Sequence, residues 1–131
     1  MPRPHVVIIG SGFGGLFSAR ALAKADVDIT LVSKTTAHLF QPLLYQVATG
    51  ILSSGEIAPA TRDILANQKN AKVLLCEVSK INLNSHIVVA EKLSKQVILR
   101  YDYLIVAAGA GQSYFGNDHF AEFAPGMKSI D

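Results

Sequence analysis

Three glycines near the N-terminus have the spacing of a dinucleotide-binding turn. The run from His5 to Gly15 reads HVVIIGSGFGG, which places Gly10, Gly12 and Gly15 in the pattern G-x-G-x-x-G. In such a turn the first glycine allows the bend, the second lets the backbone approach a pyrophosphate, and the third lets helix and strand pack closely. The free N–H groups of a following helix would then bind the phosphate oxygens.

The residues on either side of this turn favour the elements that it needs. Val6 to Ile9 are four β-favouring apolar residues, typical of a strand buried on both faces. The alanine-rich stretch from Leu16 to Ala23 has the apolar spacing of a helix packed on a sheet. A second strand over Val27 to Val32 completes a βαβ unit. A glycine cluster alone also marks ordinary turns, so it is the strand–turn–helix order that favours a dinucleotide.

The end of the second predicted strand departs from the usual pattern. An acid is expected about 20 residues after the glycines, where it binds a ribose hydroxyl. Here Ser33 stands at that position and Lys34 follows it. A serine binds one hydroxyl but supplies no carboxylate to bind two. Lys34 leaves two interpretations open, a solvated lysine at a strand end or a contact to the 2′-phosphate of NADP.

Composition excludes several classes of function. The formal net charge is +2, from 12 basic and 10 acidic side chains, and no basic stripe with interleaved aromatics is present, which argues against nucleic-acid binding. Cys76 is the only cysteine, so the chain has neither an intrachain disulfide nor a redox-active cysteine pair, and its apolar neighbours predict a buried strand residue. Without a signal peptide or an apolar run of about 18 residues, we expect a soluble cytoplasmic chain.

The segment from Thr35 to Ser54 is unusual for a loop of this kind of fold. It is dense in large apolar residues, which need something to pack on, either the protein core or a flat aromatic ligand. We expect His38 to be a hydrogen-bonded loop residue and not a base or metal ligand, because no carboxylate or second histidine lies at ligand spacing.

The remaining pattern predicts an α/β fold, a Rossmann-like parallel sheet with flanking helices plus a three-stranded β-meander. A short amphipathic helix is expected over Glu56 to Asn67. The meander strands are expected at Lys72 to Val78, His86 to Ala90 and Gln96 to Tyr101. Tyr103 to Gly109 is expected to be a buried parallel strand, and its small C-terminal residues leave room for a ligand where open α/β sheets bind theirs.

Two further motifs resemble those of flavoproteins with two dinucleotide-binding domains. These proteins place FAD on a first G-x-G-x-x-G and carry a later strand ending in Ala-Thr-Gly or Ala-Ala-Gly, as in Ala107 to Gly109 here. The run His38 to Gly50, HLFQPLLYQVATG, resembles the signature of type II NADH:quinone oxidoreductases, the non-proton-pumping NADH dehydrogenases. Residues 107–116 are similar to actinobacterial, particularly mycobacterial, members. The resemblance covers essentially all 131 residues.

The resemblance implies FAD as cofactor, NADH as substrate and a membrane quinone as electron acceptor. Family members are about three times longer, so residues 1–131 are expected to be the N-terminal part of the FAD-binding domain. The NADH-binding domain and an amphipathic C-terminal membrane anchor would lie beyond Asp131. The parent protein is then expected at the cytoplasmic face of the plasma membrane, with a homodimer as an open alternative to a monomer.

The same resemblance assigns cofactor contacts and no catalytic acid, base or metal ligand. The FAD pyrophosphate is assigned to Gly10, Ser11, Gly12, Phe13, Gly14 and Gly15. The adenosine end is assigned to Ser33 and Lys34 at the ribose and to the backbone of Val78 at the adenine. The flavin end is assigned to Thr49, Gly50 and Gln46 near the isoalloxazine, and to Ala108 and Gly109 near the ribityl chain.

Two other functions remain open at this point. One is a non-catalytic FAD-binding remnant without turnover. The other is an NADP-binding Rossmann reductase that uses Lys34 and binds no flavin.

Overall fold

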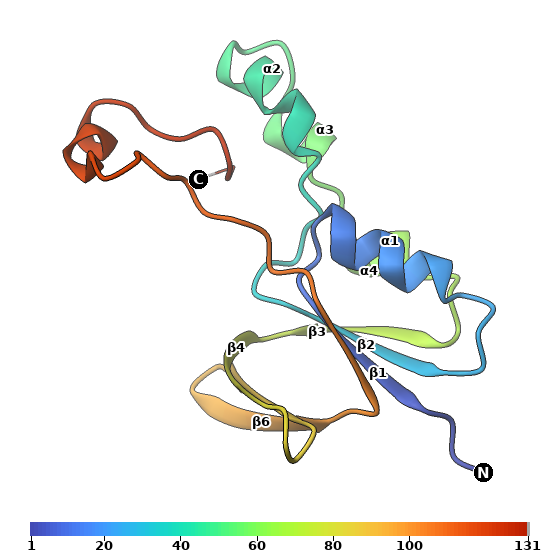
Figure 1. Ribbon diagram of the computed structural model, residues 1–131. Helices are drawn as coiled ribbons and strands as arrows, with labels where there is room; N and C mark the ends of the chain where they lie inside the picture. The colour runs from blue at the N-terminus through green and yellow to red at the C-terminus, as the bar shows by residue number, and fades with distance from the viewer. Residues whose placement is uncertain (131) are drawn as a thin grey trace.

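A parallel sheet carries the glycine turn. In the computed structural model, which describes residues 1–130, four strands lie in the order β3-β2-β1-β7 (Figure 1). They are β1 (His5–Ile9), β2 (Asp28–Ser33), β3 (Ala71–Leu75) and β7 (Tyr103–Val106). Ile8 of β1 pairs with Leu31 of β2 and Ile105 of β7. Residues Val6 to Ile9 are all buried, which confirms the prediction of a strand covered on both faces.

Helix α1 (Phe13–Ala21) covers one face of this sheet together with the short helix α4 (Thr61–Ile64). The helix buries Leu16 and Ala19 against Val6, Ile8 and the strand next to them. The predicted strand–turn–helix–strand unit is therefore confirmed, although the helix ends at Ala21.

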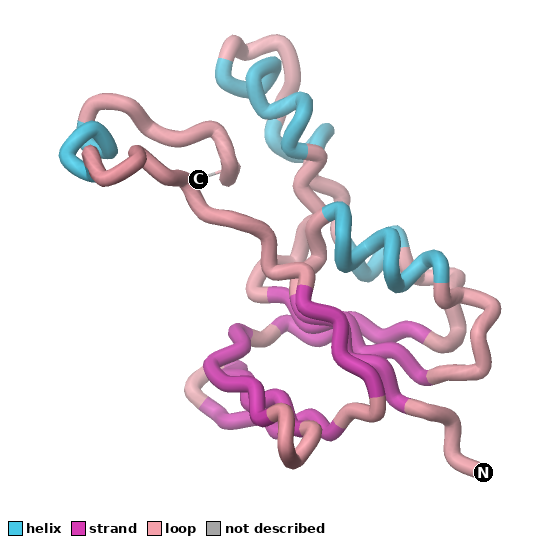
Figure 2. The backbone as a smooth tube through the Cα atoms, viewed as in Figure 1, coloured by secondary structure: helices cyan, strands magenta, loops and turns pink. Residues whose placement is uncertain are grey.

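A second, antiparallel sheet covers the other face. It contains β4 (Glu77–Asn82), β5 (Ile87–Lys92) and β6 (Lys95–Arg100) in chain order. Figure 2 shows the two sheets as separate groups of strands, joined through the connections on either side of the meander. Their shared core combines side chains of both sheets, namely Val7, Ile9, Val32, Cys76, Val88, Ala90 and Tyr101.

The predicted strand over Lys72 to Val78 is wrong in extent and in sheet. Ala71–Leu75 is the third parallel strand, and the first strand of the meander begins only at Glu77. The chain changes sheet at Cys76, whose N–H donates to the Ser33 carbonyl at 2.9 Å. A continuous apolar run cannot reveal this change, because residues in both sheets face the same core. The burial predicted for Cys76 is confirmed, outside any strand.

The predicted helix over Glu56 to Asn67 is also wrong, because two helices of four residues replace it. They are α3 (Ser54–Ile57) and α4, and Pro59 lies between them. A proline has no N–H to donate and disfavours helical geometry in the residue before it, and Ala58 accordingly has φ −132° and ψ 63°.

Residues 37–60 form a helical hairpin that stands away from the sheets (Figure 1). It contains the 3₁₀ turn η1 (Gln41–Leu43), α2 (Leu44–Ala48) and α3. Its two legs are joined at the base by an antiparallel bridge between Ala37 and Ala60. The His38 N–H donates to the Pro59 carbonyl at 2.9 Å, and the Phe40 N–H donates to the Ile57 carbonyl at 2.7 Å.

After β7 the chain leaves the sheet and crosses toward the hairpin. Residues 107–130 contain the 3₁₀ helix η2 (Asp118–Glu122) and are mostly exposed. The Gln41 side-chain amide donates to the Met127 carbonyl at 3.0 Å, which joins η1 of the hairpin to this last segment. Among residues 1–130, no helix is long and apolar enough to cross a membrane.

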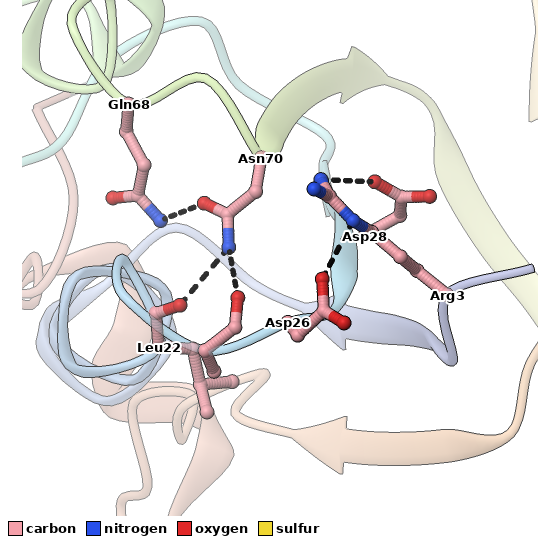
Figure 3. A network of polar contacts seen from close by, with 7 residues as sticks. Arg3, Leu22, Asp26, Asp28, Gln68 and Asn70 are labelled. Carbon is pink, nitrogen blue, oxygen red and sulfur yellow. Dashed lines mark hydrogen bonds and ion pairs between the residues drawn. The ribbon is translucent and has the colours of Figure 1, made fainter.

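A polar network fixes the far end of α1. The Asn70 side-chain amide donates to the carbonyls of Leu22 and Ala25 at 3.0 and 3.2 Å, and the Gln68 amide donates to the Asn70 oxygen at 3.0 Å (Figure 3). These bonds satisfy carbonyls at and beyond the last turn of the helix. The entry to β3 thereby holds the helix on the sheet.

Candidate cofactor-binding site

Two of the three motif glycines are required by close backbone contacts. Gly10 has φ +103°, and a Cβ there would lie 2.2 Å from the Ala107 carbonyl oxygen. A Cβ on Gly15 would lie 1.8 Å from the Gly10 carbonyl oxygen. Any side chain at either position would force the backbone apart. The turn, the first turn of α1 and the end of β7 therefore pack at a distance that only glycine allows.

Gly12 differs from these two, because the space beside it is open. Apart from its neighbours along the chain, no heavy atom of the described residues lies within 4 Å of the position that a Cβ would take, and its φ of −69° is ordinary for any residue. The protein itself therefore does not require a glycine here. A ligand that must approach the backbone closely does require one.

The N-terminus of α1 is available to an anion. Gly12 is the N-cap residue, and neither a capping side chain nor an acidic residue of the first turn is found there among residues 1–130. The first N–H groups of a helix have no partner within the helix, and the helix dipole places positive potential at this end. A phosphate group would satisfy both features.

Ser11, between two of the glycines, is buried and held from two sides. Its hydroxyl lies 2.7 Å from the Ser33 hydroxyl at the end of β2. Its carbonyl lies 2.8 Å from Nδ1 of His38, which is buried at the base of the hairpin. The prediction that His38 is a hydrogen-bonded loop residue is confirmed. Its contact with the glycine turn was missed, because it joins residues 27 positions apart in the chain.

The residues predicted for the adenosine end lie at the end of β2 and in the meander. Ser33 is buried, whereas Lys34 is exposed and follows it directly. Val78 was predicted to end a strand, and this prediction is wrong. It is the second residue of β4, and its side chain packs into the core between the sheets. The bond from Cys76 to the Ser33 carbonyl keeps this segment beside the end of β2.

The end of β7 is adjacent to the glycine turn. The Ala107 N–H donates to the Ile9 carbonyl at 2.8 Å, and the Ala107 Cβ would be 3.3 Å from a Cβ on Gly14. Ala108 and Gly109 follow as exposed residues, and Gly109 has φ +74°. Ala107, identified in the sequence only as part of the Ala-Ala-Gly motif, is thus the residue that shapes the turn from this side.

The structure does not bring the predicted hairpin residues against the glycine turn. Gln46 and Thr49 bond within the hairpin: the Gln46 amide donates to the Tyr45 hydroxyl at 3.0 Å, and the Thr49 hydroxyl donates to the Tyr45 carbonyl at 3.0 Å. Gly50 ends this turn with φ +77°. These residues lie on the part of the hairpin that extends away from the sheets (Figure 1).

An aromatic patch lies between the glycine turn and the hairpin. The Phe13 ring contacts the rings of Phe17, His38 and Phe40, with centroid distances of 6.4, 5.1 and 5.5 Å. Three of these side chains are well exposed, Phe13 at 39%, Phe40 at 42% and Phe17 at 58%. An exposed cluster of aromatic side chains is therefore a candidate binding surface.

No group of three or more His, Cys, Asp or Glu side chains within residues 1–130 is placed to hold a metal ion.

Two relatives from Mycobacterium tuberculosis are very similar to this chain. The type II NADH:quinone oxidoreductase Ndh is 68% identical over 131 residues, which cover 99% of this chain and 28% of that protein. The second enzyme, NdhA, is 67% identical over 98% of this chain and 27% of that protein. The chain therefore spans less than a third of the length of these relatives. Its resemblance to mycobacterial type II enzymes is confirmed.

Solved structures show the same fold. The NDH2 of Plasmodium falciparum in complex with NADH has a TM-score of 0.78 and 30% identity over 87% of this chain and 24% of that one. A sulfide:quinone oxidoreductase from Aquifex aeolicus has a TM-score of 0.74 and 27% identity over 85% of this chain and 25% of that one. The family model described as "Pyridine nucleotide-disulphide oxidoreductase" matches residues 4–129. The chain therefore belongs to the pyridine nucleotide-disulphide oxidoreductase family.

Proposed function

We propose that residues 1–131 are the FAD-binding N-terminal part of a type II NADH:quinone oxidoreductase. The observation that carries this proposal is the open, uncapped backbone at Gly12, inside a turn where Gly10 and Gly15 are sterically required. The identity of 68% to a type II NADH:quinone oxidoreductase supports the particular reaction. The single cysteine supports it as well, because no disulfide pair is available within these residues for the chemistry of the disulfide reductases.

The residues present fit FAD. Its pyrophosphate needs backbone donors and a close approach, both of which the start of α1 offers at Gly12. Its flat ring system needs apolar surface, and the exposed aromatic side chains of Phe13 and Phe40 are such a surface. When bound, FAD supplies the redox chemistry, hydride uptake from NADH and release of two electrons to quinone.

The chain's own residues would bind and orient the cofactor. Backbone groups of residues 10–15 bind the pyrophosphate, with Gly12 at the closest approach. Ser33 and Lys34 lie at the adenosine ribose, and Lys34 is the exposed one of the two. The Val78 backbone lies near the adenine. Ala108 and Gly109 lie beside the ribityl chain, where the turn after β7 passes the glycine turn.

The hairpin residues Gln46, Thr49 and Gly50 are proposed for the isoalloxazine end. Their side-chain and backbone bonds stay within the hairpin, so their exposed surface is free to meet a ligand. We expect the hairpin residues at the isoalloxazine end to become ordered when they contact the cofactor and the rest of a longer protein. None of these residues is assigned an acid–base role.

The partners of the whole protein follow from the same proposal. NADH and a quinone are its substrates. Because quinones are lipid-soluble, the whole protein would work at a membrane, and we assign it to the cytoplasmic face. The NADH-binding domain and the membrane anchor would lie in the part of the protein that corresponds to the uncovered length of the relatives. A homodimer stays a prediction.

The first test is the visible absorption spectrum and native mass of the 131-residue chain after incubation with FAD. We expect flavin bands and a mass increment of one FAD. The Gly12→Val variant should fold but lose the flavin, because its side chain would occupy the space proposed for the pyrophosphate. Gly55→Val is a matched control, since Gly55 also has no heavy atom within 4 Å of its Cβ position but lies on the hairpin. Flavin retained by Gly12→Val would contradict the pyrophosphate assignment.

A steady-state NADH oxidation assay with a short-chain quinone tests the reaction. Turnover by the loaded chain, or by a longer chain that contains it, supports the proposed oxidoreductase. FAD binding with no turnover in either would support the non-catalytic alternative. NADP binding without flavin would support the third interpretation, based on Lys34.

A further inference from the structure

The carbonyl of Ser11 is held by a side chain from the hairpin. His38 is 6% exposed, and its Nδ1 lies 2.8 Å from the Ser11 carbonyl oxygen. A carbonyl oxygen can only accept, so Nδ1 must carry the hydrogen and donate it. The ring is also held edge-on by Phe13, with centroids 5.1 Å apart and planes at 86°.

This bond acts on the peptide group that joins Ser11 to Gly12. The peptide is trans, so its carbonyl and its N–H point in opposite directions. A donor that fixes the Ser11 carbonyl therefore fixes the Gly12 N–H on the side away from His38. That N–H is one of the unpaired donors at the start of α1.

Glycine at position 12 makes this restraint necessary. Rotating the peptide by half a turn would change ψ of Ser11 and φ of Gly12, and a glycine accepts positive φ at almost no cost. Gly12 is exposed and carries no side chain, so no Cβ of its own opposes the rotation. Among residues 1–130, the bond from His38 is the contact that holds the Ser11 carbonyl in its observed direction.

Ser33 holds the same residue from the other side. Its hydroxyl lies 2.7 Å from the Ser11 hydroxyl and accepts the Thr35 N–H at 3.2 Å. The Ser11 hydroxyl in turn points to the Ala37 carbonyl at 3.5 Å. Ser33, which stands where an acid was expected, therefore hydrogen-bonds to the glycine turn through Ser11, in addition to any contact with a ribose.

We propose that His38 is a positioning residue, which directs the Gly12 N–H toward the cofactor pyrophosphate and couples the hairpin to the glycine turn. The coupling arises because the His38 backbone N–H also donates to Pro59, in the other leg of the hairpin, at 2.9 Å. The proposal rests on the proposed function, since FAD is the ligand whose phosphates Gly12 would meet. Its structural part, the restraint of the 11–12 peptide, holds without any ligand.

Two substitutions separate hydrogen bonding from packing. In His38→Asn, the side-chain Nδ2 stands the same number of bonds from Cα as Nδ1 of histidine, so the donor is kept. His38→Leu keeps a buried apolar side chain and removes the donor. If the ring only fills space, His38→Leu should keep more of the FAD affinity than His38→Asn. If the hydrogen-bond donor matters, His38→Asn should keep more of it.

The test is FAD affinity, from flavin fluorescence titration of the 131-residue chain, together with amide hydrogen exchange of Leu16 without FAD. The Leu16 N–H is the readout because it donates to the Gly12 carbonyl at 3.0 Å. We expect His38→Leu to weaken FAD binding about tenfold, as the loss of one hydrogen bond does. His38→Asn should stay within about twofold of the wild type on the same grounds. Exchange of the Leu16 amide should accelerate in the leucine variant only. His119→Leu and His119→Asn, in the exposed η2, should change neither readout.

The possible outcomes are distinct. Equal affinity and equal exchange for wild type and His38→Leu would overturn the proposal, as would an asparagine variant no better than leucine. Amide exchange in β5 reports whether His38→Leu has unfolded. If it has, the proposal is decided by His38→Asn. Wild-type FAD affinity and exchange in His38→Asn would support the proposal, and weakened affinity or faster exchange would overturn it. If neither the 131-residue chain nor a longer chain that contains it binds FAD, the proposed function fails, and the exchange comparison alone still decides whether His38 restrains the turn.

Discussion

The glycine turn and the hairpin are both assigned to one cofactor, yet they are built in opposite ways. In the turn, Gly10 and Gly15 meet backbone at distances that no side chain tolerates. The hairpin is joined across its base by a few backbone bonds and leaves large apolar side chains in solvent, with Tyr45 53% and Ile51 69% exposed.

This difference separates a preformed end of the site from an adaptable one. Backbone donors held by steric contact need no ordering when a ligand binds, so they cost little entropy. An exposed apolar hairpin gains stability only when something covers it. We therefore expect the phosphate end to provide most of the affinity. The ring end should become ordered on contact with the flavin and with the remainder of a longer protein.

The largest effect is expected from alanine at Gly15. Its Cβ would lie 1.8 Å from the Gly10 carbonyl oxygen, which is rigid backbone. Gly15→Ala should lower the free energy of unfolding by more than about 3 kcal/mol and abolish FAD retention. The same change at Gly55, on the hairpin, meets no heavy atom within 4 Å and should be neutral or stabilising by about 0.5–1 kcal/mol. Urea denaturation of both variants measures the contrast, and equal losses would contradict it.

A smaller effect is expected from removing the hairpin's buried anchor. Ile57 is 2% exposed and lies opposite Phe40, whose N–H donates to its carbonyl. Ile57→Ala should cost about 2–3 kcal/mol, and the loss should fall on the hairpin. Amide exchange should speed up in α2 and α3 while α1 and β1 keep their protection. Faster exchange throughout the chain would mean that the turn and the hairpin unfold as one unit, and it would contradict the distinction between a rigid turn and an adaptable hairpin.

A substitution at Thr61, the first residue of α4, is expected to stabilise the chain and not to destabilise it. Its side chain is fully buried, and its hydroxyl has no hydrogen-bond partner among residues 1–130. Thr61→Val removes this polar group at nearly constant shape and should raise the free energy of unfolding by about 1 kcal/mol. Thermal unfolding measures it. Destabilisation would show that the hydroxyl has a partner, such as a bound water.

The smallest effect concerns Glu56, at the start of α3. The Ser53 N–H donates to the Glu56 carboxylate at 2.6 Å, and the Ser53 hydroxyl does so at 2.8 Å. These bonds lower the pKa of Glu56 below its ordinary value of 4.5. Because the folded pKa is depressed, the contribution to hairpin stability is fully present above the ordinary value and is lost as the pH falls through the folded pKa.

Amide exchange or NMR shifts of α3 across this acidic range measure the effect. Glu56→Gln should remove the acid-dependent part and leave the glycine turn unaffected. The side chain is exposed, so solvent screening keeps the change small. If α3 still loses stability at acidic pH in Glu56→Gln, another titrating group is responsible for the pH dependence.

Local patterns predicted most of what surrounds the turn. Four buried strand residues, a glycine cluster and an amphipathic helix can each be identified within a few positions of sequence, because strand alternation and helix periodicity are local properties. The same holds for the burial of Cys76. The division of the 56–67 segment could have been foreseen from Pro59, since the steric effect of a proline on its neighbours is also local.

The sequence by itself determined that a strand, a glycine turn and a helix follow one another, and it predicted a dinucleotide phosphate at their junction. Only the tertiary structure decided that the apolar run after Ala71 is divided between two sheets at Cys76. It also decided that His38 holds the Ser11 carbonyl, and that Gly15 touches Gly10. Such contacts depend on the path of the folded chain, which brings together groups whose spacing along the sequence carries no signal.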